Sequence, residues 1–412
     1  MKFFKQLTGR KPKGHLRSRL RSLAAYISGM IRNKSSHLSS LGKGLLQLIK
    51  GHSRMKAAKK FLYNKAIDYQ RYYLPYMKEL VKLLIPFLPS KHTIELAIDG
   101  SQIGKHHAIL MVSLVYGKRS IPIGWLVKKG AKGHFSKANH VELVEQVQKD
   151  LADVLPSERT IILLGDGEFG SVALQECCRL ENWSYVFRIA CNTLLYKDEE
   201  VFRAKDLTVG KAKDYLILRE LEPLPTDTLF NSIGRWSLPQ ELEKIPNQNH
   251  LFIEEVAFTK EQFTGVHFVL WHDPKHDKPV PLISNLDNDA LIIEAYDKRW
   301  AVECLFKDLK STSFKLDKTR LKEAKAIDNL VMIAAFAFIL VINIGRLYNK
   351  HAIREYVHQV RPDQVVCSIF SLGLALVILF LDYDIDFCFN QEIPFSIEQI
   401  KKRVKSSIED IS

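Results

Sequence analysis

The chain of 412 residues is long enough to bury a sizeable core and to form two or three domains. Its composition, 46% apolar and 26% charged, excludes a disordered or a fibrous protein. Its six cysteines show neither C-x-x-C pairs nor histidines at zinc-site spacing, so we expect reduced thiols and no structural zinc. The formal net charge is +14, and it is unevenly distributed.

The first 67 residues are strongly basic. They contain 17 Lys or Arg residues and no Asp or Glu, and the first acidic residue is Asp68. Such a segment indicates binding to nucleic acid, although a membrane-surface arm or a solvated tail has the same composition. Because residues 41–62 mix apolar and basic side chains in a helical manner, we predict a helical DNA-binding domain over residues 1–85. Pro86 and Pro89 mark its end.

Residues 90–191 predict the first part of an α/β core with a mixed sheet. Strand and helix patterns follow one another in the order β-β-β-α-β-α-β. The strands are predicted at 94–98, 107–116, 120–128, 160–164 and 185–189, and the helices at 139–155 and 171–182. Gly117-Lys118-Arg119 joins the second and third strands as a hairpin.

The rest of the chain divides into three parts. Gly and Pro punctuate short β-like runs such as 215–218 and 266–271, so residues 192–282 predict a mostly β insertion. Residues 283–345 complete the core with its last helix, and residues 346–412 predict a helical C-terminal region. The apolar run 330–342 has thirteen residues, too few to cross a bilayer, so we expect a buried helix and no membrane partner.

Two predicted strands run into an aspartate followed by glycine. Asp99 follows the strand 94–98, and Asp166 follows 160–164 after one glycine. An aspartate at this point lies where a sheet opens to solvent, and the glycine lets a ligand approach the backbone. Each Asp-Gly pair taken alone is also typical of a simple turn. On neighbouring central strands, and with Glu303 on a later helix, the two aspartates can converge on a pair of divalent cations.

Residues 296–310 predict one helix with a polar stripe. At about 100° per residue, its polar side chains fall within about 60° of arc, and they are Tyr296, Arg299, Glu303 and Lys310. A carboxylate flanked by cations suits a site that holds a metal ion and the phosphates around it. An exposed helix of mixed charges is the alternative.

The spacing of these four residues resembles a known signature. Tyr296-x2-Arg299-x3-Glu303-x6-Lys310 is similar to the Y-x2-R-x3-E-x6-K pattern of bacterial DDE transposases of the insertion-sequence-four family. Asp99 in Ala-Ile-Asp-Gly-Ser and Asp166 in Leu-Gly-Asp-Gly-Glu-Phe resemble the first two catalytic aspartates of that family. The resemblance implies an RNase H-like core in which Asp99, Asp166 and Glu303 are catalytic and bind metal. It also implies that Tyr296, Arg299 and Lys310 bind DNA phosphates.

The resemblance further implies a reaction and its partners. Two Mg²⁺ ions, which Mn²⁺ can replace, would serve cut-and-paste transposition through nicking, hairpin formation, hairpin opening and strand transfer. The partners would be double-stranded DNA, both as terminal inverted repeats and as target, and a second copy of the chain in a synaptic homodimer. The place would be the bacterial cytoplasm at the nucleoid. A Trp in the family's insertion accommodates a flipped base, and Trp300 and, by rough position only, Trp271 are the candidates.

Two other functions remain open. An RNase H-like DNA nuclease without strand transfer would share the carboxylates but would need neither the polar stripe nor the insertion. An inactive DNA-binding descendant of a transposase would have a damaged carboxylate set, whereas all three residues are present here. His140 and Glu168, which lie near these motifs in the sequence, are expected to be structural.

Overall fold

The structure is a computed structural model that describes most of the chain. The described residues are 11–45, 51–130, 135–198, 200–207, 250–272, 278–349, 351–358 and 368–383. The strand predicted at 215–218 lies outside them, as do parts of the basic segment and of the C-terminal region.

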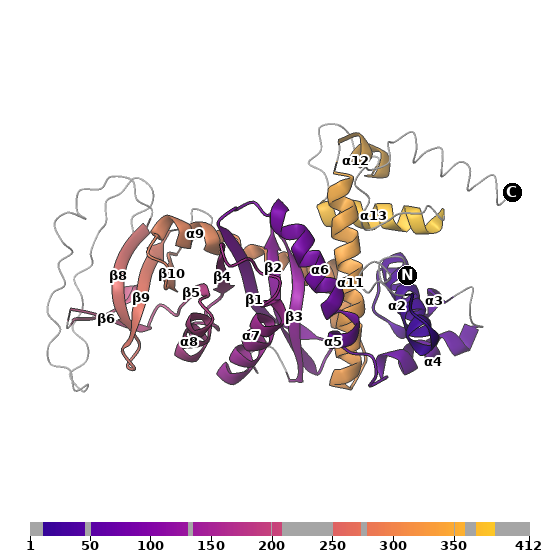
Figure 1. Cartoon of the computed structure of the whole chain (residues 1–412), viewed down its shortest axis with the longest axis horizontal. Helices are drawn as coiled ribbons and strands as arrows, with labels where there is room; N and C mark the ends of the chain where they lie inside the picture. The colour runs from indigo at the N-terminus through magenta and orange to yellow at the C-terminus, as the bar shows by residue number, and fades with distance from the viewer. Residues whose placement is uncertain are drawn as a thin grey trace.

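One sheet of ten strands runs through the protein in the order β3-β2-β1-β4-β5-β10-β9-β8-β6-β7 (Figure 1). Its first half consists of β1 (Thr93–Ile103), β2 (His107–Tyr116), β3 (Arg119–Lys129), β4 (Thr160–Gly165) and β5 (Ser184–Arg188). β2 is antiparallel to β1 and β3, whereas β4 is parallel to β1 and β5. The predicted α/β class is confirmed, and this strand order is consistent with an RNase H-like core.

The central strands are buried on both faces, which explains their continuous apolar runs. All of β2 is buried, as is all of β1 except Gln102. β1 nevertheless carries four buried polar side chains at odd-numbered positions, Thr93, Glu95, Asp99 and Ser101. Because alternate residues of a strand point to the same face, these four polar side chains share one side of the sheet.

Two helices connect the parallel strands. α7 (Lys137–Leu151) begins at Ser136, whose hydroxyl accepts a hydrogen bond from the backbone N–H of Asn139 in a capping box. α8 (Val172–Leu180) begins at Ser171, which caps the backbone N–H of Leu174 in the same way. These helices match the two that the sequence predicts in this part of the chain.

The strands that follow β5 in the sequence extend the same sheet. They are β6 (Leu194–Lys197), β7 (Glu200–Arg203), β8 (His250–Phe258), β9 (Phe263–Trp271) and β10 (Val280–Ser284), which occupy the left of Figure 1. β10 pairs antiparallel with β5, with Leu282 opposite Arg188 and Ser284 opposite Val186. The region predicted as an insertion is therefore joined to the core by a continuous hydrogen-bonded ladder.

The end of the chain contributes three described helices beside the sheet. α11 (Ala324–Leu347) is followed by α12 (His351–His358) and α13 (Ile369–Asp382). By length and composition α11 could cross a membrane, but 78% of its apolar window is buried inside the protein, as in a core helix. α13 crosses α11 closely, since a Cβ atom on Gly345 would overlap the carbonyl oxygen of Ile369.

The described helices before the sheet pack onto this core. They are α2 (Gly14–Asn33), α3 (Leu38–Lys43), α4 (Gly51–Leu62), α5 (Tyr69–Tyr72), α6 (Leu74–Leu84) and the short η1 (Ile85–Phe87). The hydroxyl of Tyr73 donates to the carbonyl of Pro122 on β3 at 2.6 Å, and the side chain of Asn329 on α11 donates to the carbonyl of Leu62 at 2.8 Å. Buried polar contacts of this kind fix the helices against the sheet.

The segment predicted as one helix over 296–310 is divided into three pieces. α9 (Asp289–Asp297) ends before Lys298, α10 (Trp300–Lys307) follows, and η4 (Asp308–Thr312) is a π-helical turn. The break is made by short-range hydrogen bonds, because the backbone N–H of Arg299 donates to the carbonyl of Tyr296 at 2.9 Å. The expectation of a single continuous helix was therefore wrong.

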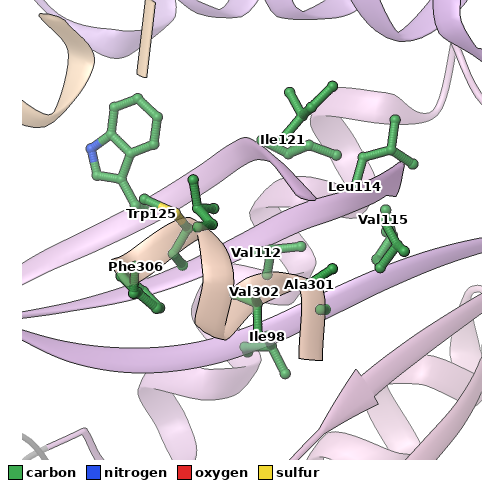
Figure 2. Close-up of a cluster of buried hydrophobic side chains, with 14 of the residues drawn as sticks. Ile98, Val112, Leu114, Val115, Ile121, Trp125, Ala301, Val302 and Phe306 are labelled. Atoms are coloured by element: carbon green, nitrogen blue, oxygen red, sulfur yellow. The ribbon is translucent and has the colours of Figure 1, made fainter. Parts of the chain in front are cut away.

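α10 packs on β1, β2 and β3. Its residues Ala301, Val302 and Phe306 belong to the same buried cluster as strand residues such as Val115 and Trp125 (Figure 2). The apolar side of α10 thus holds the helix on the core strands. Its polar side chains, including Glu303, lie on the other side of the helix.

Candidate active site

The register of β1 and β4 brings the two predicted aspartates side by side. The parallel pairing runs from Thr93 opposite Thr160 to Ala97 opposite Leu164. Continued by two residues, the same register sets Asp99 beside Asp166, on strands about 5 Å apart. Asp99 lies within β1 rather than at its end, but it is just beyond the part of β1 that β4 covers. At this position the carboxylate of Asp99 lines a cleft.

A cleft of about 360 Å³ contains all three predicted carboxylates and most of the predicted cations. It is lined by Asp99, Gly100, Ser101, Asp166, Arg299, Glu303, Phe306, Lys307 and Lys310. The lining comes from β1, from the loop after β4 and from the segment α10–η4, which are distant in sequence. Three anionic and three cationic side chains in so small a space make a site for a phosphate group and for cations that accompany it.

Backbone amides fix the two aspartates. The N–H of Gly100 donates to the carboxylate of Asp99 at 2.7 Å. The N–H of Glu168 donates to the carboxylate of Asp166 at 3.0 Å. The two contacts fix the orientation of both carboxylates in the cleft.

Glu303 is held by a cation of its own helix. Its carboxylate accepts a hydrogen bond from the guanidinium of Arg299, one turn earlier. The Arg299 side chain is mostly buried, and the charge of Asp99 also acts on it. Arg299 therefore stands between two of the three carboxylates and balances their charge.

Lys310 joins the opposite end of this segment to β1. Its ammonium group donates to the hydroxyl of Ser101 at 2.9 Å. Ser101 is buried, and it is two residues after Asp99 on the same face of the strand. Lys310 therefore lies in the cleft beside the carboxylates, about one helical turn after Lys307.

The donor set of the cleft fits Mg²⁺, a hard cation that prefers carboxylate oxygens. Within the described part of the chain, no three Asp, Glu, His or Cys side chains stand close enough together to hold a metal ion as they are. One oxygen of the Glu303 carboxylate is paired with Arg299.

A second, larger cleft of about 1290 Å³ adjoins the first, and Arg299 and Glu303 line both. Its walls are rich in cations: Lys118, Arg119, Arg188, Lys298, Arg299, Arg346 and Arg354. The aromatic side chains in its lining are Tyr116, Trp271, Tyr296 and Trp300. A wall that combines cations with aromatic rings suits the phosphates and bases of an unpaired nucleic acid strand.

Three of the predicted residues, Tyr296, Trp300 and Trp271, line this second cleft but not the small one. Tyr296 is buried under the guanidinium of Arg299, which lies 5.6 Å from the ring centroid, and burial raises the pKa of its hydroxyl. Trp300 is 61% exposed, whereas Trp271 is only 7% exposed. Trp300 is thus free to contact a ligand over much of its ring, and Trp271 offers only an edge.

Comparison with known proteins identifies the family. The sequence matches the model of the transposase DDE domain over residues 87–340. The chain belongs to the transposase DDE domain family. The family supports a transposase-type nuclease activity, whereas the narrower insertion-sequence-four assignment rests on the spacing of Tyr296, Arg299, Glu303 and Lys310 alone.

Other comparisons add little to this assignment. No curated protein matches the sequence. Among solved structures, the chain is similar to endonuclease V of Ciona intestinalis, described in complex with a 24mer DNA containing an inosine followed by a ribo-adenosine. The identity is 16% and the TM-score 0.28, with 58% of this chain and 99% of the other chain covered.

Several cations of the second cleft were not predicted from the sequence. Arg188 ends β5, and Arg346 lies near the end of α11 with its guanidinium 3.5 Å from the ring centroid of Tyr116. Arg354 lies on α12. Nothing in the local sequence singles out these residues, because only the fold brings three distant elements to one cleft.

His140 lies close to Asp166 but does not line the first cleft. Its ring is buried against Phe169 at 4.7 Å between centroids, and its Nε2 lies 4.0 Å from the carboxylate of Glu168. Burial lowers the pKa of His140 against the opposing charge of Asp166, so the ring is neutral near pH 7. A neutral buried ring agrees with the structural role expected for this residue.

Proposed function

We propose that this protein is a DNA transposase of the insertion-sequence-four type. It cuts DNA at terminal inverted repeats by nicking, hairpin formation and hairpin resolution, and it then joins the freed ends to target DNA. The observation that carries the proposal is the small cleft shared by Asp99, Asp166, Glu303 and the cations Arg299, Lys307 and Lys310. Membership of the transposase DDE domain family supports it.

In this proposal the three carboxylates hold two Mg²⁺ ions, or Mn²⁺ in their place. When bound, such ions supply Lewis-acid stabilisation of the phosphate charge and lower the pKa of a nucleophilic water or hydroxyl. Glu303 would help to hold the cations, and the guanidinium of Arg299 would bind a phosphate by a two-pronged hydrogen bond. Lys310 and Lys307 add point charges on the same side of the phosphate.

The second cleft is proposed to receive the strand that leaves the duplex at the cut. Arg188, Arg346 and Lys118 would bind its phosphates, and the exposed ring of Trp300 would stack on a base that no longer pairs. Tyr296 would donate a hydrogen bond to a phosphate of the DNA strand at the point where that DNA strand passes from one cleft to the other. The basic N-terminal helices bind the terminal repeats, and two copies of the chain pair the two ends.

The test uses DNA that carries the terminal inverted repeats flanking the gene. Purified protein and Mg²⁺ are incubated with this DNA, and the products of the wild type and of Glu303→Gln are resolved on a denaturing gel. We expect hairpin-ended fragments with the wild type and none with the variant, because the amide is a poor metal ligand.

The runner-up is an RNase H-like nuclease, which the same gel separates from a transposase. A nuclease would give nicks that depend on Glu303 but no hairpins and no joined products. An inactive descendant would bind the repeats and cut nothing in either metal ion. Either result would overturn the proposed reaction.

A further inference from the structure

An ion pair between the buried Glu95 and the partly buried Lys298 links β1 to the segment that carries Glu303. Glu95, on β1, is 3% exposed, and its carboxylate accepts hydrogen bonds from the hydroxyl of Thr93 at 2.8 Å and from the ammonium of Lys298 at 2.7 Å. Lys298 also reaches the carboxylate of Glu294 at 3.0 Å. A buried carboxylate is costly unless it is paired and hydrogen-bonded, and these contacts satisfy that need.

Lys298 lies close in sequence to two residues of the candidate active site. Lys298 lies in the break between α9 and α10, immediately before Arg299 and five residues before Glu303. Glu95 lies on the same face of β1 as Asp99, since the two are four residues apart on one strand. The ion pair therefore links the strand of one candidate catalytic carboxylate to the start of the helix of another.

A second contact holds the far end of the same segment to the same strand. Lys310 donates to Ser101, which shares the face of Glu95 and Asp99. The two contacts are six residues apart on the strand, roughly 20 Å. They are twelve residues apart on the helical segment, roughly 18 Å. Because these lengths agree, the segment runs along β1 with Glu303 between its two attachment points.

We propose that Glu95 and Lys298 are positioning residues that set the distance between Glu303 and Asp99 for metal binding. The inference rests on the proposed function, because it takes Asp99 and Glu303 as metal ligands. Neither residue of the pair lies in the small cleft that holds the carboxylates. They act through the backbone of β1 and α10, by fixing where the helix starts relative to the strand.

Stability alone does not require an ion pair at this place. Replacing a buried pair by apolar side chains of similar size is often neutral or stabilising, whereas removing one partner alone is harmful. The double variant Glu95→Met with Lys298→Met therefore removes the positioning contact and keeps a packed core. Lys298→Arg keeps the charge and a reach toward Glu95, and it serves as the conservative variant.

The experiment measures Mn²⁺ binding to the free protein by electron paramagnetic resonance, beside thermal unfolding and binding to repeat DNA. For the double variant we expect the Mn²⁺ dissociation constant to rise by at least about tenfold, the usual effect of losing a residue that orients metal ligands. Lys298 also lines the second cleft, so the double variant should lose some DNA affinity as well, and the Mn²⁺ measurement, made without DNA, carries the test. Lys298→Arg restores most of the Mn²⁺ affinity.

Lys78→Met is the matched control, because Lys78 forms an ion pair of 2.6 Å with Asp153 away from both clefts. It should leave Mn²⁺ binding unchanged. Wild-type Mn²⁺ affinity in a folded double variant would overturn the positioning role and leave the proposed function standing. A wild type that binds no Mn²⁺ would instead overturn the metal site of the proposed function, and the inference with it.

Discussion

Arg299 and Glu303 form an ion pair one helical turn apart, at the point where the two clefts meet. The guanidinium, together with Lys307 and Lys310, offsets the negative charge of the three carboxylates that line the small cleft. If Glu303 binds metal as proposed, the guanidinium and the metal ion would compete for its carboxylate.

Glu303→Gln should abolish cleavage. We expect the rate to fall by more than about a hundredfold, because even residues that only orient metal ligands cost about 10–100-fold when they are changed. Affinity for repeat DNA should change little, since Arg299, Lys307 and Lys310 remain in the cleft. A single-turnover cleavage assay with a parallel gel-shift measurement checks both. Glu145→Gln, an exposed change on α7, is the control, and equal rates for the two variants would contradict the site.

Arg299→Ala should separate metal binding from DNA binding. Freed from the guanidinium, Glu303 should take part in Mn²⁺ binding more readily, so the dissociation constant should fall a few-fold in the absence of DNA. Cleavage should nevertheless decrease, because alanine cannot make the two-pronged hydrogen bond to phosphate. Titration with Mn²⁺ and a cleavage assay on the same preparation measure the two effects. Weaker Mn²⁺ binding by the variant would show that Arg299 supports the metal site instead of competing for it.

Trp300 and Trp271 should respond in opposite ways to truncation. Trp300→Ala should keep the free energy of unfolding within about 0.5 kcal/mol, because its ring is 61% exposed. It should weaken hairpin formation if the ring stacks on an unpaired base, an interaction worth about 1–3 kcal/mol. Trp271→Ala should cost about 3 kcal/mol of stability, since this ring is 7% exposed. Denaturant unfolding and hairpin yield distinguish the two, and a strongly destabilised Trp300→Ala would argue against the stacking role.

The exposed cations of α4 should contribute to DNA binding through charge alone. Lys56, Lys59 and Lys60 are exposed on this helix, and changing all three to Gln should weaken binding to any sequence. The plot of log affinity against log salt should become less steep by up to about 0.9 for each phosphate that the variant no longer neutralises. Lys149→Gln, on the exposed side of α7, is the control. An unchanged salt slope in the triple variant would remove α4 from the DNA-binding surface.

Asp308 should give the protein a distinctive dependence of stability on pH. Burial raises its pKa to about 6, against the opposing charges of Arg119 and Lys307. The folded protein therefore holds this proton more tightly than the unfolded chain, and the stabilisation present below about pH 4 is lost as the pH rises to about 6. Asp308→Asn does not titrate, so between about pH 4 and pH 7 it should gain about 2 kcal/mol relative to wild type. Denaturant unfolding at both pH values measures this difference, and parallel curves would contradict the raised pKa.

The parts of the fold that were predicted from the sequence are those set by local patterns. Continuous apolar runs identified β1, β2, β3, β4 and β5, and the Asp-Gly pairs marked the two positions that the parallel register sets side by side. The small cleft also gathers Arg299, Glu303 and Lys310, as the spacing suggested. These features depend on residues that are near neighbours in the chain or on strands in a predictable order.

The parts that were missed depend on partners far away in the sequence. The break before α10 places Lys298 against Glu95, which is 203 residues distant, and no helical periodicity reveals that contact. Tyr296 lines the second cleft and not the small one, although its ring still lies under the guanidinium of Arg299. The pairing of β10 with the core strand β5 was not predicted. The apolar pattern of a strand is the same whether it joins the core sheet or a separate sheet of an insertion.

The pairing of β5 with β10 also limits which regions of the protein could be deleted without exposing the core sheet. A shortened chain without residues 192–282 would lack β6, β7, β8, β9 and most of β10, and it would leave β5 paired only with β4, with its other edge exposed. An exposed strand edge is a template for another chain, so such a truncated protein would tend to self-associate through that edge. Among the strands that the structure describes, the last one at that side of the sheet is β7, a strand of four residues, which is too short to recruit a neighbour effectively.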